Sequence, residues 1–214
     1  SNHIIFKCPH CEQLYLDVEY MSYNTCGAIH YSDGYKEGDM ITSGVVIVKC
    51  INQACLQIFH IEEALLIAEP KVDEVLQTEW EAAFNMKKYV PSSDSFREAI
   101  AMKYGDNVED EQALRIWLLR IFNHRFRKSG AEDFNSIEKM QYTQNLQRLI
   151  SLVERKDNDH LLFLAELHRE AGEFEKCLHL IREIKNAAGY IQAIIPLISK
   201  RAKVKERRVF VIGE

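Results

Sequence analysis

The sequence is poor in the residues that dominate loops and disordered chains, since its 214 residues include 4 prolines and 9 glycines. Disordered, collagen-like and low-complexity chains are not built from such a composition. Long apolar runs are also missing. Ile191–Ile198 is short and contains Pro196, whereas a membrane helix needs about 18 or more apolar residues. We therefore expect a folded protein that is not integral to a membrane.

Arginine is absent from the first 69 residues, which contain three lysines and nine acidic residues and so have a net charge of −6. The rest of the chain carries 24 basic and 23 acidic residues. Six basic residues gather near the end of the sequence: Lys200, Arg201, Lys203, Lys205, Arg207 and Arg208. This segment could contact nucleic acid, but the acidic N-terminal part would repel a phosphate backbone. Nucleic-acid binding is therefore our alternative functional hypothesis.

Common catalytic motifs are missing as well. The sequence contains no HExxH, P-loop, GxSxG or dinucleotide-binding fingerprint. Cys177 with His168 and His179 is the one nucleophile and base set that the spacing suggests. Because Cys177 falls at a helix-packing position, we expect a buried, inert thiol. We expect no enzymatic activity.

The cysteines that are present cluster strongly. Cys8 and Cys11 form a CxxC pair, and after 38 intervening residues Cys50 and Cys55 form a CxxxxC pair. Two such loops can each place two thiolates on one tetrahedral ion. Four thiolates leave no open coordination position, so this pattern predicts a structural zinc site, with zinc as the cofactor.

Other interpretations of these cysteines stay open. A disulfide framework ranks second, and it is more typical of small secreted domains. A redox CxxC would sit between a strand and a helix, but Leu14–Glu19 alternates like a strand. Cys26 and His30 could replace a proposed ligand, whereas His10 and His60 are interpreted as residues that face solvent or support the site.

Strand patterns surround these cysteines. Four runs have the alternation or the β-branched content of strands, with turn residues between them: 14–19, 28–36, 45–50 and 56–60. The segment resembles a zinc ribbon, a module of metal-binding loops and hairpins. The spacing between the cysteine pairs is longer than in compact ribbons and leaves room for an inserted hairpin.

After Glu62 the apolar period changes from two to about 3.6. This pattern predicts helices over 72–84, through 113–124, and at about 134–155, 159–171, 173–187 and 190–202. Ser95 and Glu98 form a candidate capping box, and Gly105 is a candidate stop. We interpret the aromatic residues at helical spacing, including Trp117 and Phe122, as packed core. The basic positions 120–128 are interpreted as a solvated helix end.

The segment 161–189 follows the spacing of one tetratricopeptide repeat, at Leu164, Ala165, Gly172, Phe174 and Cys177. Several positions depart from that pattern, and no neighbouring copy is convincing. Together, the two halves resemble uncharacterised bacterial proteins that join a four-cysteine zinc ribbon to a tetratricopeptide-like helical region. This resemblance implies an adaptor that binds a protein or peptide partner in a groove between helices.

We therefore predict an α+β protein. Residues 1–69 would form the zinc-ribbon-like β module, 70–200 an all-α domain with one repeat-like unit, and 201–214 a basic C-terminal tail. The cysteine usage suits a reducing compartment, and we expect a cytoplasmic location.

Overall fold

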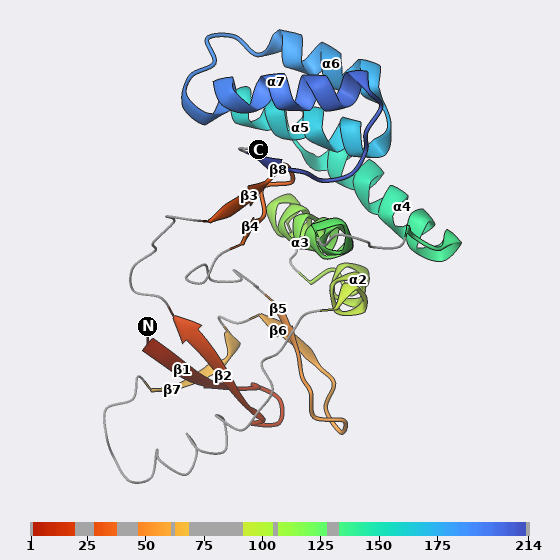
Figure 1. The fold of residues 1–214 in the computed structure, drawn as a ribbon. Coiled ribbons are helices and arrows are strands. Elements are labelled where there is room, and N and C mark those ends of the chain that lie inside the picture. The colour runs from red at the N-terminus through yellow and green to blue at the C-terminus, as the bar shows by residue number, and fades with distance from the viewer. Residues whose placement is uncertain are drawn as a thin grey trace. The chain divides into compact units, whose positions relative to one another are not determined.

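A computed structural model describes residues 2–19, 28–37, 47–60, 63–68, 92–104, 107–127 and 133–212. The chain divides into two compact units. The first comprises Ser1–Ala28 with Gly38–Ala101, and the second comprises Ile29–Glu37 with Met102–Glu214. Strands at the N-terminal side followed by helices confirm the predicted α+β class (Figure 1).

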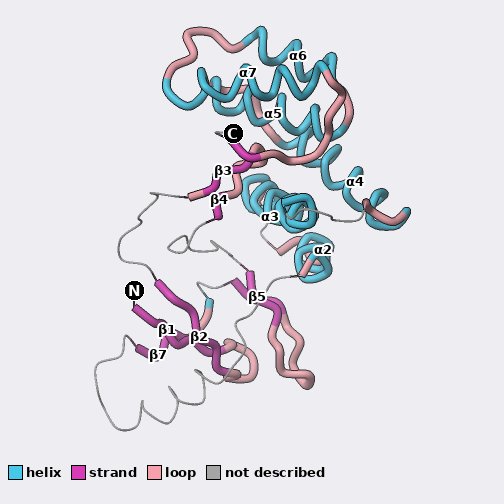
Figure 2. The backbone as a smooth tube through the Cα atoms, viewed as in Figure 1, coloured by secondary structure: helices cyan, strands magenta, loops and turns pink. Residues whose placement is uncertain are grey.

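The first unit contains two small antiparallel sheets. One has the order β2-β1-β7 and is built from β1 (Asn2–Lys7), β2 (Leu14–Glu19) and β7 (Leu65–Ala68). The other pairs β5 (Ile47–Lys49) with β6 (Ile58–His60). Figure 2 shows β1, β2 and β7 side by side. The strands β2, β5 and β6 fall within predicted runs, but β1 and β7 were not predicted, because their apolar residues are consecutive and do not alternate.

Aromatic rings fill the core of the first unit. The rings of Phe6 and Tyr15 are stacked with centroids 5.1 Å apart, and Phe59 meets Tyr15 edge-on at 6.0 Å. The buried side chains of Cys8 and Cys50 pack in the same cluster. Buried aromatic pairs add directional contacts to the apolar burial, so this core places the cysteines on a fixed support.

The helix α2 (Ser93–Ala101) completes the described part of this unit and contacts β5, where Lys49 forms an ion pair with Glu98. The predicted capping box at Ser95 is wrong. The Ser92 hydroxyl accepts the Ser95 backbone N–H at 3.2 Å, so the cap lies three residues earlier. Both Gly105 and the helix predicted over 72–84 lie outside the described residues.

The second unit holds five helices among its described residues. They are α3 (Val108–Arg127), α4 (Ser136–Leu152), α5 (Asn158–Ala171), α6 (Phe174–Glu183) and α7 (Gly189–Lys203). Each contacts the next, and α5 also contacts α7 (Figure 1). None of the described helices combines the length and apolar character needed to cross a bilayer.

Local signals set these helix ends. Asn135 and Glu138 form a reciprocal capping box at the start of α4. At the end of α5, Gly172 takes a left-handed conformation with φ 83°, which suits glycine. The predicted bounds of α5 and α7 agree with the structure within one residue, while α6 ends at Glu183, before the predicted 187. Trp117 is half-buried, and Phe122 is buried beside Phe134 and Tyr142 as the core interpretation requires.

A third sheet belongs to the second unit and joins distant parts of the sequence. Its order is β4-β3-β8, from β3 (Ile29–Tyr31), β4 (Lys36–Glu37) and β8 (Val211–Ile212). The run predicted as one strand over 28–36 is interrupted by a turn in which Asp33 Oδ1 accepts the Tyr35 N–H at 3.1 Å. Of the segment predicted as a basic tail, residues 201–203 lie in α7 and Val211–Ile212 lie in this sheet. The domain boundary at residue 69 stays a prediction.

Buried charged groups link this hairpin to the helices. Asp33 and Arg127 form an ion pair whose side chains are 0% and 2% exposed. The Arg127 guanidinium also lies 4.0 Å from the centre of the Tyr35 ring. The interpretation of 120–128 as a solvated helix end is therefore wrong for Arg127, because the hairpin at 29–37 packs onto it, a contact that helical periodicity could not reveal.

Further hydrogen bonds connect Asp33 to buried polar side chains of α3, α4 and α5. Asn123 Nδ2 donates to Asp33 at 3.1 Å and to Glu170 at 3.0 Å, and the Tyr142 hydroxyl donates to Glu170 at 2.6 Å. Nearby, Arg169 forms a two-point ion pair with Glu166, at 2.6 and 2.7 Å. The helices of the second unit thus enclose a polar network of side chains and backbone carbonyls, in which Glu170 Oε1 has no hydrogen-bond partner among the described residues.

Candidate metal centre

Two short loops carry the four N-terminal cysteines. The first joins β1 to β2, where Cys8 N–H donates to the Gln13 carbonyl at 2.9 Å. The second joins β5 to β6, where Cys50 N–H donates to the Gln57 carbonyl at 2.8 Å. Both loops close a hairpin, and a residue with positive φ lies at the end of each: Glu12 at 59° and Leu56 at 50°.

The loops bring the four predicted sulfurs together. Cys8 Sγ lies 3.9 Å from Cys55 Sγ, Cys11 Sγ lies 3.5 Å from Cys50 Sγ, and all four lie within 4.8 Å of one another. Sulfurs bound at about 2.3 Å to a tetrahedral zinc are separated by about 3.8 Å. The separations also exceed the roughly 2.05 Å of a disulfide bond, and all four residues are free thiols. The donor set and its spacing fit a tetrahedral thiolate-bound metal ion.

Donors around the sulfurs stabilise negative charge on them. The His10 N–H lies 3.4 Å from Cys8 Sγ, and Asn52 Nδ2 lies 3.6 Å from Cys11 Sγ. Asn52 also shapes its own loop, since its Oδ1 accepts the Ala54 N–H at 3.0 Å. The Asx turn is typical of asparagine in tight loops, so this supporting residue could have been found from the sequence.

Tyr15 is a supporting residue that the sequence analysis missed. Its hydroxyl accepts the Ile51 N–H at 2.8 Å and lies near the Cys50 side chain. Burial raises the pKa of Tyr15, as does the interaction with Cys50, so the hydroxyl keeps its proton. Nothing in the spacing of Tyr15 distinguishes it from an ordinary core aromatic residue of a strand.

Burial governs the protonation of the innermost thiols. It raises the pKa of Cys8 to about 12, and it also raises the pKa of Cys50. Bringing bare thiolates together in this core is therefore unfavourable. A bound cation would offset that cost, because a metal ion deprotonates the thiols that coordinate it.

The substitute ligands considered from the sequence fall elsewhere. His30 lies in β3 and pairs with Ile212 of the second unit. His10 is exposed at the tip of its loop, and His60 is half-buried in β6. Cys26 lies outside the described residues. Within the described part of the chain, the group of possible metal ligands consists of Cys8, Cys11, Cys50 and Cys55.

The candidate nucleophile has the surroundings of a structural thiol. Cys177 is fully buried in α6, and burial raises its pKa to about 12. The two histidines near it in sequence pair with carboxylates: His168 with Glu173 at 2.5 Å, and His179 with Glu183 at 2.9 Å. A thiol held in its neutral form is a poor nucleophile.

The basic residues near the C-terminus are divided between internal contacts and solvent. Arg201 pairs with Glu206 at 2.6 Å, Arg207 Nε donates to the Glu170 carbonyl at 2.9 Å, and Arg208 pairs with Asp133 at 2.5 Å. The three lysines, Lys200, Lys203 and Lys205, are exposed. Three of the six predicted contact residues therefore already make contacts within the chain, two of them as ion pairs, although Arg207 and Arg208 are also exposed.

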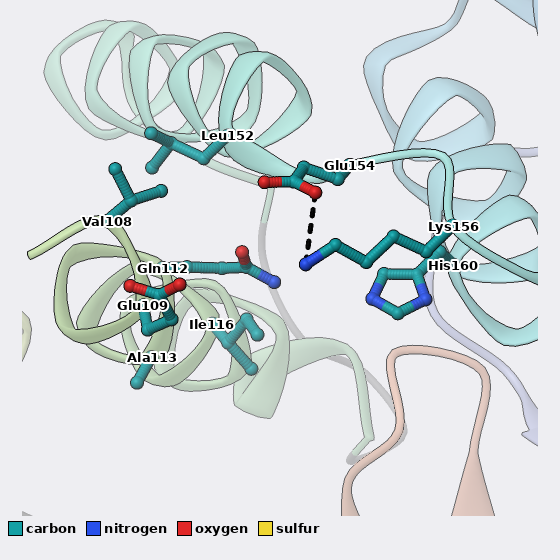
Figure 3. Close-up of a pocket in the computed structure, with 9 residues that line it drawn as sticks. All are labelled: Val108, Glu109, Gln112, Ala113, Ile116, Leu152, Glu154, Lys156 and His160. Atoms are coloured by element: carbon teal, nitrogen blue, oxygen red, sulfur yellow. Dashed lines mark ion pairs between the residues drawn. The ribbon is translucent and has the colours of Figure 1, made fainter.

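A surface pocket of about 280 Å³ lies between α3 and the start of α5. Figure 3 shows the Lys156 ammonium directed at Glu154, which it meets at 3.0 Å, with Gln112 and Glu109 opposite. Its apolar part comes from Val108, Ala113, Ile116 and Leu152. Its charges are mixed, so it favours neither an anionic nor a cationic ligand.

Comparisons with known proteins identified no relative of this chain. No family model matches the chain, and no match was found among curated proteins or solved structures. The four-cysteine cluster in an N-terminal β region, followed by a helical region, agrees with the coarse features of the resemblance described above.

Proposed function

We propose that this protein is a non-enzymatic zinc-binding adaptor, in which zinc stabilises the first unit and the helical unit binds a protein or peptide partner. The observation that carries the proposal is the group of four cysteine sulfurs within 4.8 Å of one another. Four soft donors favour zinc in a reducing environment such as the cytoplasm. A fully thiolate-bound zinc has no open position for substrate, so its role is structural.

Metal analysis of the purified chain tests the centre. We expect one zinc per chain, and a cobalt-substituted sample should have the intense visible absorption of tetrahedral thiolate coordination. Cys8→Ser should lower the zinc content, while Cys177→Ala, which removes a thiol outside the cluster, should leave it unchanged. Metal-free protein, disulfides in the mass spectrum or a water-ligated cobalt spectrum would contradict the proposal.

The helical unit supports the interaction role. A helix pair, α5 and α6, packs tightly and is continued by α7, which contacts both. This arrangement is in keeping with the repeat-like interpretation of 161–189, and helix arrays of this kind offer grooves between their elements. The pocket beside α3 is a candidate for such a groove.

Nucleic-acid binding through the segment at 200–208 is the weaker alternative. Three of its arginines already contact Glu206, Glu170 and Asp133. With these arginines partly engaged, the exposed cations of the segment would give weak and salt-sensitive binding. A mobility-shift assay at low salt should show no shift, and a shift abolished by Lys200→Glu, Lys203→Glu and Lys205→Glu would favour this alternative.

A further inference from the structure

The four cysteines of the candidate metal centre differ in their access to solvent. Cys8 and Cys50 are 0% and 1% exposed, whereas Cys11 and Cys55 are half-buried. Each hairpin loop therefore contributes one buried thiol and one accessible thiol. A small oxidant from solution reaches Cys11 and Cys55 first, because oxidation of cysteine depends on exposure.

Two sulfur contacts cross from one loop to the other. Cys11 Sγ lies 3.5 Å from Cys50 Sγ, and Cys55 Sγ lies 3.9 Å from Cys8 Sγ. Each accessible thiol thus has a buried thiol of the opposite loop beside it. A disulfide needs about 2.05 Å between its sulfurs, so each pair has to approach by less than about 2 Å.

A bond within one loop would distort a short segment whose backbone is already fixed by hydrogen bonds. In the first loop, Glu12 N–H donates to the Cys8 carbonyl at 2.9 Å. In the second loop, the N–H groups of Cys55 and Leu56 donate to the Asn52 carbonyl at 2.9 and 3.0 Å. Two hairpins can approach each other without breaking these bonds, so the geometry favours pairing between the loops.

We propose that this centre is also a peroxide-responsive site, in which oxidation releases zinc and joins the two loops through Cys11–Cys50 and Cys8–Cys55 disulfides. This inference rests on the proposed zinc site and adds its regulation. The new bonds link the same two hairpins that a shared zinc ion links. The oxidised first unit would therefore keep these hairpins together without metal.

The reaction balances with hydrogen peroxide as the oxidant. The Cys11 sulfur attacks one peroxide oxygen, the O–O bond breaks, and the departing hydroxide takes a proton to become water. The Cys50 sulfur then attacks the Cys11 sulfenic acid, so that an S–S bond forms and the S–O bond breaks with loss of a second water. The two sulfurs lose two electrons, and one peroxide gains them. Cys55 and Cys8 react in the same way with another peroxide, and the loss of all thiolate ligands frees Zn²⁺.

Peptide mapping of the zinc-loaded full chain, treated stepwise with hydrogen peroxide and then alkylated, tests the pairing. Trypsin cleaves on both sides of each loop, because lysines lie at positions 7, 36, 49 and 71. The peptides 8–36 and 50–71 then carry one pair of cluster cysteines each. Bonds between the loops join these peptides, whereas bonds within the loops leave them separate. We expect the joined peptides, and fragmentation should show Cys11 bonded to Cys50 and Cys8 bonded to Cys55.

Zinc release supplies a second measurement. Followed with a chromophoric chelator, it should rise in step with the joined peptides. Dithiothreitol and added zinc should then restore the zinc content, because disulfides are reversible and sulfinic acids are not. Two controls apply. Zinc removal by a chelator without oxidant should leave free thiols, and Cys26→Ser with Cys177→Ala, which keeps the four cluster cysteines, should give the same joined peptides.

The inference is overturned if the oxidised cysteines pair within each loop, pair with Cys26 or Cys177, or appear as sulfinic acids. Zinc that stays bound in excess peroxide would overturn it as well. In each of these cases the proposed zinc site and adaptor role still stand. A reduced chain that takes up no zinc would overturn the proposed function itself, and this inference with it.

Discussion

The two units bury polar groups in different ways. In the first, the thiols of Cys8 and Cys50 are buried within an aromatic core, and the described cluster offers them a few hydrogen-bond donors but no positively charged side chain. In the second, Asp33 and Glu166 are buried against Arg127 and Arg169. Buried charge must be compensated. The second unit pairs these charges internally, whereas under the proposed function the sulfur cluster of the first unit would depend on a bound ion.

Metal removal should give the largest difference between the units. A chelator that strips zinc, or Cys8→Ser, should unfold the first unit, because apparent binding free energies of structural zinc reach about 10–16 kcal/mol. The second unit should keep its helices. Hydrogen exchange mapped by mass spectrometry would detect fast exchange in residues 2–19 and 47–60 and unchanged protection in α4 to α7. Simultaneous loss of protection in both units would contradict the comparison.

Breaking the internal ion pair should be the next largest effect. Arg127→Met leaves the fully buried Asp33 carboxylate without its cation, which typically costs about 3–5 kcal/mol in the free energy of unfolding. Urea denaturation monitored by helical circular dichroism measures this loss. The double variant Asp33→Asn with Arg127→Met removes both charges and should recover part of the stability. If the double variant is no more stable than Arg127→Met, the pair is not the source of the effect.

These two cores also differ in how far the sequence could predict them. The spacing of the cysteines predicted a four-sulfur cluster because metal chemistry restricts the residue types and their spacing, and the structure brings all four sulfurs together. Helical periodicity gave α5 and α7 closely for a similar reason, since a regular period repeats within the element itself. The contact of Asp33 with Arg127 joins residues 94 positions apart, and no local pattern specifies such a pairing.

Tyr15, which supports the candidate metal centre, is a second residue whose role no local sequence pattern predicted. Tyr15→Phe keeps the ring against Phe6 and Phe59 but removes the hydroxyl that contacts Ile51 N–H and Cys50. We expect zinc affinity to fall about 10–100-fold, as is typical when partners of metal ligands are removed. Competition with a chromophoric chelator measures it.

The control for Tyr15 is the same substitution in the other unit. Tyr31→Phe removes a hydroxyl that donates to Glu37 at 2.9 Å in the hairpin of the second unit. Zinc affinity should be unchanged in this variant. Equal losses in the two variants would mean that the effect is general destabilisation and not support of the metal centre.

The smallest effect concerns the pH dependence of the second unit. Burial, followed by the nearby charges of Glu166 and Asp33, raises the pKa of Glu170 to about 8. In the unfolded chain this carboxyl has a pKa of about 4.3. Between these values the folded state binds more protons than the unfolded state, so the free energy of unfolding decreases as pH rises and levels off above the folded pKa. The contribution is at most about 1.4 kcal/mol per pH unit.

Glu170→Gln should flatten this dependence, because glutamine has no titrating proton and its carbonyl can still accept from Tyr142 and Asn123, as Glu170 Oε2 does. Urea denaturation of zinc-loaded protein between pH 6 and pH 8 gives the slope for each variant. Glu175→Gln, an exposed position on the neighbouring α6, serves as the control and should keep the wild-type slope. A wild-type slope in Glu170→Gln would show that Glu170 is already ionised in the folded state. The carboxylates of this core would then all be charged, and Arg169 and the other cations would have to balance Glu170 as well as Glu166.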